Sequence, residues 1–478
     1  MRDFLKKQFW ILVFFLFVPS AAASTLSDRI AFILKQNGLA DSQMSIKIVS
    51  LPDGRELYAK NPDQGLNPAS NIKLITMAAA LREFGPDYTF PTEFYAPALV
   101  GKDGRLPNLW IKGYGDPAFV TEELEDLVRR FKAAGLKRID GDVFVDDTYY
   151  DRNNLTTYIA DVNEKLYSIM TGPLSFNFNS IKIRAKPARR LGEKPVISID
   201  PPTRYVTVEN EAKTAWAGAN VDLDAEVKEA KPRKAKKETN VIRIRGTIPR
   251  TIQEYNFQRG VPDPAIYTGT VVLEALERHG IQVKGGLRRE AVPANALLLF
   301  THSSKPLREI LKSLGKFSNN FTAEQLVKAM AAKRFGPPGS IPKGLKVLRS
   351  YLESLGIPGR DFVLDNGSGL TRLSSVSADD FIRLLHDLYV SPWRDDFVAS
   401  LAVAGVDGTL ARKFKGGEVT GRMYAKTGTL NDVKALSGYV FGERGRLAFS
   451  FLFNEFNAPM DNIARAQEEI LETILDSL

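Results

Sequence analysis

The chain has 478 residues, of which 44% are hydrophobic and 25% charged, a composition that is typical of a folded globular protein and excludes a disordered chain. Its net charge of +9 favours anionic surfaces such as a membrane face or an acidic polymer, but no compact basic stripe with interleaved aromatic residues and no zinc-finger spacing indicates a nucleic-acid partner. The absence of cysteine excludes a thiol nucleophile, a disulfide framework and cysteine-ligated metal.

The first 23 residues have the order of a secretory signal peptide. One arginine and two lysines come first, residues 9–18 form an apolar run, and the small residues Ala21 and Ala23 follow. A membrane span needs about 20 apolar residues, so an uncleaved anchor is the less favoured alternative. We predict cleavage near Ala23 and an exported, periplasmic chain that has no integral membrane span and is at most loosely associated with the membrane or the wall.

The next elements are a helix, a hairpin and a second helix. Apolar residues recur at helical spacing in 25–36, and 42–62 alternates like two strands joined by a Pro-Asp-Gly turn. The second helix opens near Ser70, and a long strand-rich middle follows. The chain turns mostly helical after residue 265 and returns to strands after Lys426 before a final helix. This symmetry indicates an outer unit built from both ends of the chain, with the middle inserted into it.

Residues 221–240 are dense in charge and contain little to bury, which predicts a loop or solvated hairpin tip. A basic docking patch for an anionic partner is the less favoured alternative, because the acids nearly balance the bases. The histidines at 279, 302 and 386 lie far apart without H-E-x-x-H spacing, so surface or helix-end roles are favoured over metal ligation. We therefore predict no metal and no cofactor.

Ser70 and Lys73 occupy positions i and i+3 at the start of the second helix, so their side chains leave the same face. Serine becomes a nucleophile when a neighbouring base takes its proton, and a lysine whose pKa is lowered by burial or nearby cations is such a base. The apolar residues around Lys73 predict the necessary burial. The alternative is a lysine on the polar face of a surface helix, since S-x-x-K recurs at 313–316, close to the next motif, and at 340–343, in a Gly/Pro loop.

A second motif, Ser318, Asn319 and Asn320, lies just before a helical run. A hydroxyl there would pass a proton between Lys73, the nucleophile and the leaving amine, while the Asn320 amide would hold a substrate peptide group by two hydrogen bonds. An ordinary helix cap is the alternative. The S-x-N at 175–177 is set aside because its surroundings alternate like a strand.

The third motif is Lys426, Thr427 and Gly428, which enter an apolar strand pattern with Thr429. An edge strand with a cation, a hydroxyl and a glycine would bind the terminal carboxylate of a peptide and let its backbone approach closely. The backbone N–H groups of Thr429 and Ser70 would form an oxyanion hole worth a few kcal/mol. A lone K-T-G is a common turn, but the three motifs in this order form the set of penicillin-binding proteins and class A β-lactamases.

Several longer stretches surround these motifs: "PASNIKLITMAAAL", "LWIKGYGDP", "GDVFVDDTYYD", "GPLSFNFNSI", "FSNNFTAEQL", "LDNGSGLTRLSSVSADD", "LAVAGVDGTLARKF" and "AKTGTLNDVKALSGYV". Together they resemble the D-alanyl-D-alanine carboxypeptidase/endopeptidase family, the low-molecular-mass class C (type-4) penicillin-binding proteins. The likeness runs from residue 25 to the C-terminus and is weakest in 185–260. Taken alone, "GYGDP" and "DNGSG" are interpreted as turns.

The resemblance implies an α+β fold, in which a serine β-lactamase/transpeptidase-like domain, with an antiparallel sheet and a helical subdomain, carries two inserted, strand-rich domains. The predicted limits are 1–23 for the signal peptide, 24–85 and 291–478 for the two parts of the transpeptidase-like domain, 86–184 and 251–290 for the first inserted domain, and 185–250 for the nested one, which contains the charged loop 221–240.

The resemblance also implies roles for the motif residues: Ser70 as acylated nucleophile, Lys73 as its base, Ser318 and Asn320 as the second motif, and Lys426, Thr427 and Gly428 as the third. In relatives, an aspartate in a segment like "VDDTYY" contacts the amino group of the peptidoglycan diamino acid. Asp147 matches this segment best and Asp146 is its neighbour, while a turn after a strand is the alternative.

These residues predict an exported serine DD-peptidase, a D-alanyl-D-alanine carboxypeptidase and/or endopeptidase that cleaves peptidoglycan stem peptides or cross-links through an acyl-enzyme on Ser70. β-Lactams would acylate the same serine as inhibitors. A β-lactamase on the same core is one alternative, against which Ser318 and the large insertion argue. A non-catalytic peptidoglycan-binding protein is the other, against which the intact Ser70, Lys73 and Lys426 argue. The sequence leaves the carboxypeptidase-to-endopeptidase balance, the third residue of the stem peptide and the oligomeric state open.

Overall fold

The structure is a computed structural model that describes residues 25–153, 170–229 and 240–478. The predicted signal peptide lies outside these residues. Among the helices of the described ranges, none has both the length and the apolar character that crossing a bilayer requires.

Both ends of the chain contribute to one six-stranded antiparallel sheet, in the order β18-β19-β20-β21-β1-β2. Its strands are β1 (Gln43–Ser50), β2 (Glu56–Lys60), β18 (Ala402–Val403), β19 (Met423–Leu430), β20 (Val433–Phe441) and β21 (Arg446–Asn454). Strand β1 pairs with β21 along its whole length. The N-terminal hairpin therefore closes onto the C-terminal strands, as the strand pattern predicts.

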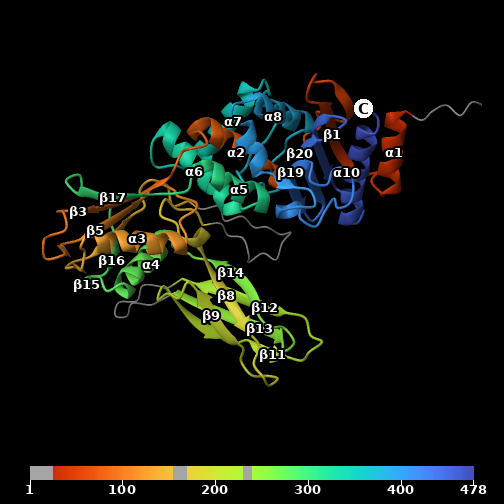
Figure 1. The fold of residues 1–478 in the computed structure, drawn as a ribbon. Coiled ribbons are helices and arrows are strands. Elements are labelled where there is room, and N and C mark those ends of the chain that lie inside the picture. The colour runs from red at the N-terminus through yellow and green to blue at the C-terminus, as the bar shows by residue number, and fades with distance from the viewer. Residues whose placement is uncertain (1–24, 154–169, 230–239) are drawn as a thin grey trace, which may run out of the picture.

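Helices cover both faces of this sheet (Figure 1). The terminal helices α1 (Leu26–Gln36) and α10 (Met460–Leu475) pack on one face through a core that includes Ile30, Ile463 and Phe451. The opposite face meets a helical subdomain: α2 (Ile72–Phe84), α5 (Leu307–Phe317), α6 (Asn320–Phe335), α7 (Ile341–Ser354), α8 (Ala378–Val390) and α9 (Arg394–Ser400). Antiparallel sheet and helical subdomain agree with the predicted fold class.

Helix α2 lies at the centre of the helical subdomain. Residues 72–81 are all buried, which is the pattern of a helix that is apolar on every side and surrounded by other elements. The prediction that Lys73 enters a buried helix is confirmed, since this lysine is fully buried with its neighbours.

The first inserted part contains a five-stranded sheet in the order β16-β7-β5-β3-β17, a small sheet β15-β6-β4 and two helices. Its elements are β3 (Pro91–Ala96), β4 (Arg105–Leu106), β5 (Leu109–Gly113), α3 (Thr121–Ala133), β6 (Arg138–Ile139), β7 (Val143–Asp146), α4 (Pro264–Arg278), β15 (Gln282–Val283), β16 (Leu287–Arg289) and β17 (Leu297–Ser303). Because β17 pairs with β3, this sheet extends beyond the predicted return limit at residue 290.

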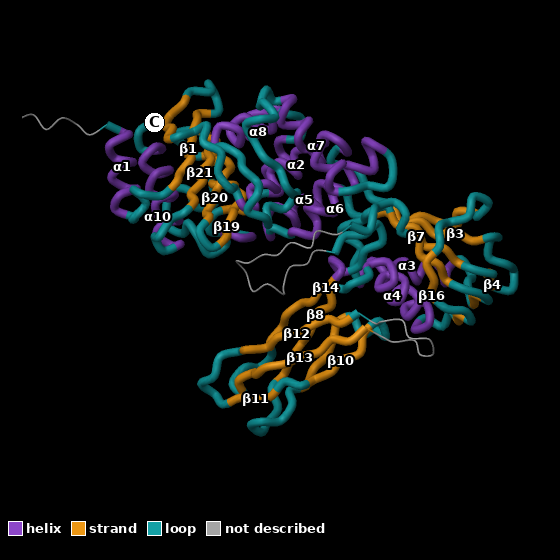
Figure 2. The backbone as a smooth tube through the Cα atoms, turned by 180° about the vertical axis from the view of Figure 1, so that it is seen from behind, coloured by secondary structure: helices purple, strands orange, loops and turns teal. Residues whose placement is uncertain are grey.

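In the described residues of the second inserted part, strands are the only regular elements after the 3-10 turn η2 (Asn177–Asn179) that precedes it. The strands are β8 (Ser180–Lys186), β9 (Val196–Asp200), β10 (Val206–Asn210), β11 (Lys213–Ala215), β12 (Asp222–Lys228), β13 (Asn240–Pro249) and β14 (Tyr255–Gly260). They project away from the helical subdomain (Figure 2). Since β8 pairs with both β9 and β14, the strand pairing spans 180–260, beyond the predicted limits of 185–250.

The prediction of a loop over 221–240 is wrong for its first half. Residues 222–228 form β12, which pairs antiparallel with β13, so this stretch is one side of a hairpin. The physical reason is the alternation D-L-D-A-E-V-K, which places Ala225 in the core and the charges in solvent. Residues 230–239 lie outside the described ranges.

The inserted parts leave and rejoin the helical subdomain at one place. Phe90 N donates to Ser304 Oγ at 2.9 Å, and Ser304 N donates to the Phe90 carbonyl oxygen at 3.0 Å. These two bonds join the residue before β3 to the residue after β17. The long excursion therefore enters and exits as a pair of adjacent strands, a few residues before the helix that leads to Ser318.

Candidate active site

Ser70 lies in the 3-10 turn η1 (Ala69–Asn71), directly before α2. The preceding Ala69 has a φ of 44°, a conformation that costs a residue with a side chain about 1–3 kcal/mol. The Asn67 side chain supports it by accepting a hydrogen bond from Ala69 N at 2.8 Å. Gly369 closes over the turn so tightly that a Cβ on it would lie 1.9 Å from the Ala69 carbonyl oxygen. The serine is thus held by a strained and closely covered backbone.

Lys73 contacts Ser70 directly. Its Nζ donates to Ser70 Oγ at 2.9 Å, to Asn320 Oδ1 at 2.6 Å and to the Ser368 carbonyl oxygen at 2.5 Å. Three acceptors take the three donors that a protonated amine has, while a neutral amine would keep a lone pair for the serine proton. The S-x-x-K pair therefore lies in contact, as its i, i+3 spacing predicts.

The surroundings of Lys73 favour its neutral form. Burial lowers the pKa of Lys73 well below its usual value, and the positive charge of Lys426 lowers it further. The negative charge of Glu324, one helical turn after Asn320 on α6, raises the pKa of Lys73 instead. Burial raises the pKa of this carboxyl group, which accepts a hydrogen bond from Gly367 N at 3.3 Å.

The second motif lies at the break between α5 and α6. Ser318 ends α5 in the left-handed conformation, with a φ of 59°, and the Asn319 side chain caps α6 by accepting from Thr322 N at 3.1 Å. The helix-cap interpretation thus holds for Asn319 alone. The break leaves the Ser318 hydroxyl to meet Lys426, and it places the Asn320 amide oxygen on Lys73. Because that oxygen is already engaged, Asn320 has its NH2 group left for a substrate.

Strand β19 carries the third motif past the serine. Lys426 is fully buried, and its Nζ donates to Ser318 Oγ at 2.9 Å. Burial lowers the pKa of Lys426 to about 7. A Cβ on Gly428 would lie 2.6 Å from the Pro68 carbonyl oxygen, so the glycine allows β19 to approach the turn of Ser70. The three motifs therefore meet around one serine.

The hydroxyl groups of two other β19 residues form hydrogen bonds with side chains. Thr427 Oγ1 donates to Thr409 Oγ1 at 2.9 Å, and Thr429 Oγ1 accepts from Lys434 Nζ at 3.3 Å. Thr409 belongs to the 3-10 turn η3 (Gly408–Leu410). The oxyanion hole of Ser70 and Thr429 N–H groups stays a prediction.

Several residues at this site were not singled out by sequence reasoning. Asn71 is buried, and in the amide orientation that satisfies both of its atoms it donates to the Lys426 carbonyl oxygen at 2.9 Å and accepts from Ser437 Oγ at 2.7 Å. It therefore connects the nucleophile turn to β19 and β20. The stretch 365–369, interpreted as a simple turn, supplies Ser368 to Lys73 and Gly369 to the serine turn. The available signal was its two glycines, which permit close backbone approach.

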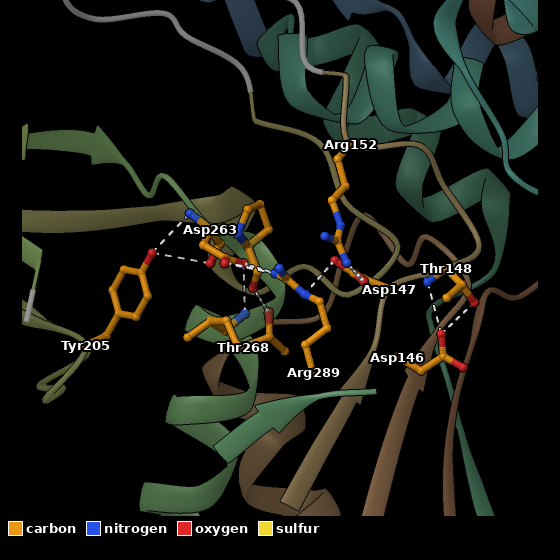
Figure 3. A network of polar contacts seen from close by, with 10 residues as sticks. Asp146, Asp147, Thr148, Arg152, Tyr205, Asp263, Thr268 and Arg289 are labelled. Atoms are coloured by element: carbon orange, nitrogen blue, oxygen red, sulfur yellow. Dashed lines mark hydrogen bonds and ion pairs between the residues drawn. The ribbon is translucent and has the colours of Figure 1, made fainter. Parts of the chain in front are cut away.

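Asp146 and Asp147 lie at the end of β7, as Figure 3 shows. Asp146 is buried and accepts hydrogen bonds from Thr148 N at 3.0 Å and from Thr148 Oγ1 at 2.6 Å. Asp147 is paired with Arg152 at 3.0 Å and with Arg289 at 3.1 Å. These partners all belong to the inserted parts, so a contact of either aspartate with substrate stays a prediction.

The competing motif matches have structural partners of their own. Lys316 forms an ion pair with Asp407 at 2.6 Å. Ser340 caps α7, so the interpretation of 340–343 as part of a Gly/Pro loop is wrong: Ile341 begins the helix, and Pro342 lies in its first turn, where proline is tolerated. The S-x-N at 175–177 runs into η2, where Asn177 has a φ of 48°, and the strand begins only at Ser180.

Comparison with known proteins gives a consistent result. The model of the D-Ala-D-Ala carboxypeptidase 3 (S13) family matches residues 26–474. A D-alanyl-D-alanine carboxypeptidase of Actinomadura sp. (strain R39) is 34% identical over 456 residues, which cover 92% of this chain and 82% of that protein.

Solved structures agree in fold. Penicillin-binding protein 4 of Haemophilus influenzae superposes with a TM-score of 0.78 at 22% identity over 93% of this chain and 99% of that one, and a second structure of that protein contains a β-lactam. A predatory peptidoglycan endopeptidase of Bdellovibrio bacteriovorus superposes with a TM-score of 0.52 at 16% identity over 91% and 93%.

Proposed function

The chain belongs to the D-Ala-D-Ala carboxypeptidase 3 (S13) family and is a serine-type peptidase, and from this premise we propose that it cleaves peptidoglycan stem peptides outside the cytoplasm through an acyl-enzyme on Ser70. One observation carries the proposal. A fully buried amine, Lys73 Nζ, lies 2.9 Å from the hydroxyl of Ser70 in surroundings that lower its pKa.

In the acylation step, neutral Lys73 takes the Ser70 proton and Oγ attacks the carbonyl carbon of the penultimate D-alanine. Backbone N–H groups of Ser70 and Thr429 stabilise the developing oxyanion. As the peptide C–N bond breaks, Ser318 passes the proton that Lys73 took from Ser70 to the leaving amine, so Lys73 becomes neutral again, while Lys426 keeps its own proton and holds the Ser318 hydroxyl. Water then attacks the ester and regenerates the serine.

Lys426 serves recognition as well. Protonated, it supplies a buried positive charge beside β19, where the terminal carboxylate of a peptide binds with the Thr427 and Thr429 hydroxyls. A carboxylate next to the scissile bond is present both in a stem peptide that ends in D-alanine and in a D-alanyl cross-link to the D-centre of a diamino acid. We therefore propose both carboxypeptidase and endopeptidase activity, and products from defined monomeric and cross-linked muropeptides, identified by mass, measure the balance.

β-Lactams are proposed to acylate the same serine. A fluorescent penicillin should label the purified protein, and mass spectrometry of the digested adduct should place the label on Ser70. Ser70→Ala should abolish labelling. Ser313→Ala is the matched control, because this serine has a lysine at the same spacing within α5 and should label like the unmodified protein.

Two results would overturn the proposal. Equal labelling of Ser70→Ala would remove the serine from its role, and failure of the folded, unmodified protein to label would favour a non-catalytic wall-binding protein. Export is tested separately: protein recovered from the periplasm should begin near residue 24.

A further inference from the structure

Three acidic or imidazole side chains gather in the first inserted part, away from the serine. Asp116 follows β5, Glu123 lies in the first turn of α3, and His302 lies on β17. One potential ligand atom from each lies within 4.8 Å of the other two. His302 Nε2 is 3.3 Å from Glu123 Oε2 and 4.0 Å from Asp116 Oδ2. Strands β5 and β17 lie on either side of β3 in one sheet, and α3 lies beside this sheet in Figure 1.

Asp116 is the residue that needs explanation. Its side chain is only 2% exposed, and Oδ1 accepts a hydrogen bond from Ala118 N at 2.8 Å. The other oxygen, Oδ2, is buried and has no hydrogen-bond partner among the described residues. Leaving an ionised carboxylate oxygen buried and unpaired is costly, and such groups in native proteins are paired or coordinate metals. Oδ2 is also the oxygen nearest to His302.

From this geometry we propose that Asp116, Glu123 and His302 bind a zinc ion. One imidazole nitrogen and two carboxylate oxygens are a ligand set that Zn²⁺ accepts, with water in the fourth position. Tetrahedral bonds of about 2.0–2.1 Å place neighbouring ligand atoms about 3.3–3.4 Å apart. The His302–Glu123 pair is already at this spacing, whereas Asp116 Oδ2, at 4.0 Å from His302 Nε2 in a cluster whose ligand atoms lie within 4.8 Å of one another, would move closer to both.

Neighbouring groups support the site. The Phe119 ring lies 5.1 Å from the His302 ring and fixes its position by packing. Lys305 is a cation that competes with a metal ion for Glu123, because its Nζ lies 4.0 Å from Glu123 Oε1. This lysine is 63% exposed and approaches the oxygen of Glu123 that does not face His302, and it forms no hydrogen bond with the buried Oδ2 of Asp116.

The ion would join three elements at the junction of the inserted parts with the helical subdomain. His302 lies two residues before Ser304, whose hydrogen bonds with Phe90 close that junction. The site differs from the sequence prediction of no metal because its ligands have no short spacing: Glu123 and His302 are 179 residues apart. The pairing of β17 with β3 and the packing of α3 against β17, through Phe131 and Phe300, bring them together.

The test uses tag-free protein, since an affinity tag of histidines would bind zinc itself. The protein is stripped with a chelator, incubated with ZnCl2, desalted and analysed for metal by mass spectrometry. We expect one zinc per chain in the unmodified protein and loss of zinc in Asp116→Asn and His302→Gln. His279→Gln is the matched control, because His279 pairs with Glu125 at 2.6 Å without a third ligand, and it should retain the ion.

Thermal unfolding gives a second readout. Zinc should raise the midpoint of the stripped unmodified protein and of His279→Gln, and should leave Asp116→Asn and His302→Gln unchanged. Circular dichroism identifies a variant that has not folded, and the other variant then carries the test. The proposal is overturned if the unmodified protein retains no zinc after desalting, if both site variants retain as much as the control, or if only Mg²⁺ raises the midpoint.

Discussion

At the scale of single residues, the site depends on two buried lysines that need opposite charge states. In the proposed mechanism, Lys73 must be neutral to accept the serine proton, whereas Lys426 must be protonated to bind a carboxylate. Their environments differ accordingly: the pKa of Lys73 is lowered by burial and then by the charge of Lys426, whereas burial alone accounts for the lowered pKa of Lys426. Lys73 is therefore expected to lose its proton first.

This order predicts the pH dependence of acylation by penicillin. The second-order rate should rise as Lys73 becomes neutral and fall as Lys426 loses its proton through pH about 7, which gives a bell-shaped profile. In Lys426→Arg the falling limb should move to higher pH, because guanidinium stays protonated. Stopped-flow measurement of acylation across the pH range checks this, and an unmoved falling limb in the variant would contradict the assignment.

Stability should respond to pH with a definite sign. The pKa of Lys426 is about 7 when folded and near its ordinary value of 10.5 when unfolded, so the cost of the buried charge is fully present below pH 7. It is relieved as the pH rises from 7 towards 10.5, where the unfolded state binds more protons. The free energy of unfolding of the unmodified protein should therefore rise relative to Lys426→Met over this range, and urea unfolding at several pH values checks it.

At the scale of elements, the nucleophile is positioned by backbone contacts between segments. The turn η1 lies between two segments, β19 and the 365–369 stretch. Gly428 of β19 and Gly369 of the stretch make the close contacts with residues 68–69. Both glycines lie where a Cβ would enter the backbone of residues 68–69. The turn η1 and the first turn of α2 together give Ser70 and Lys73 their i, i+3 geometry, but β19 and the 365–369 stretch determine where that pair faces.

Gly369→Ala should therefore slow acylation and destabilise the fold. The new Cβ would overlap the Ala69 carbonyl oxygen, and the φ of +75° is unfavourable for alanine. The matched control is Gly336→Ala, which has a φ of +78° but nothing within 4 Å of the new Cβ. For Gly336→Ala we expect a loss of about 1–2 kcal/mol in the free energy of unfolding, because of the unfavourable φ alone, and an unchanged acylation rate. Equal acylation rates of the two variants would contradict the positioning role of Gly369.

At the scale of the whole molecule, the inserted parts are anchored to the helical subdomain through α6. Lys328 is fully buried and pairs with Asp151 at 2.9 Å, and it also donates to the Asn153 carbonyl oxygen at 2.9 Å. Gln325, on the same helix, accepts from Gly172 N at 3.3 Å, and the Tyr150 hydroxyl donates to the Gln325 carbonyl oxygen at 3.3 Å. One helix thus presents Asn320 to the site and binds the insertion.

Lys328→Met should destabilise the protein by on the order of 3 kcal/mol, because it leaves Asp151 and a buried carbonyl group without their cation. Urea unfolding measures the loss. Lys333→Met serves as the control, since this lysine is exposed on the same helix, and its effect should be much smaller. A double-mutant cycle with Asp151→Asn separates the pair energy, and absence of coupling would contradict the anchoring role.

Local spacing was enough to predict several features from the sequence. Helical geometry places Ser70 and Lys73 on one face, alternation predicts the hairpin of β1 and β2, and the order of the three motifs indicates the family. The alternation in 222–228 also predicts the strand β12, although the charge density of the same stretch favours a loop.

Which distant residues meet depends on the packing of the folded chain. Ser318 reaches Lys426, Ser368 reaches Lys73, and Asp116, Glu123 and His302 gather because sheet pairing and helix packing join segments that lie far apart along the chain. When two residues are a few positions apart, the geometry of their own helix or strand determines the distance between them. A long spacing fixes no such distance, because the distance then depends on how every intervening element packs.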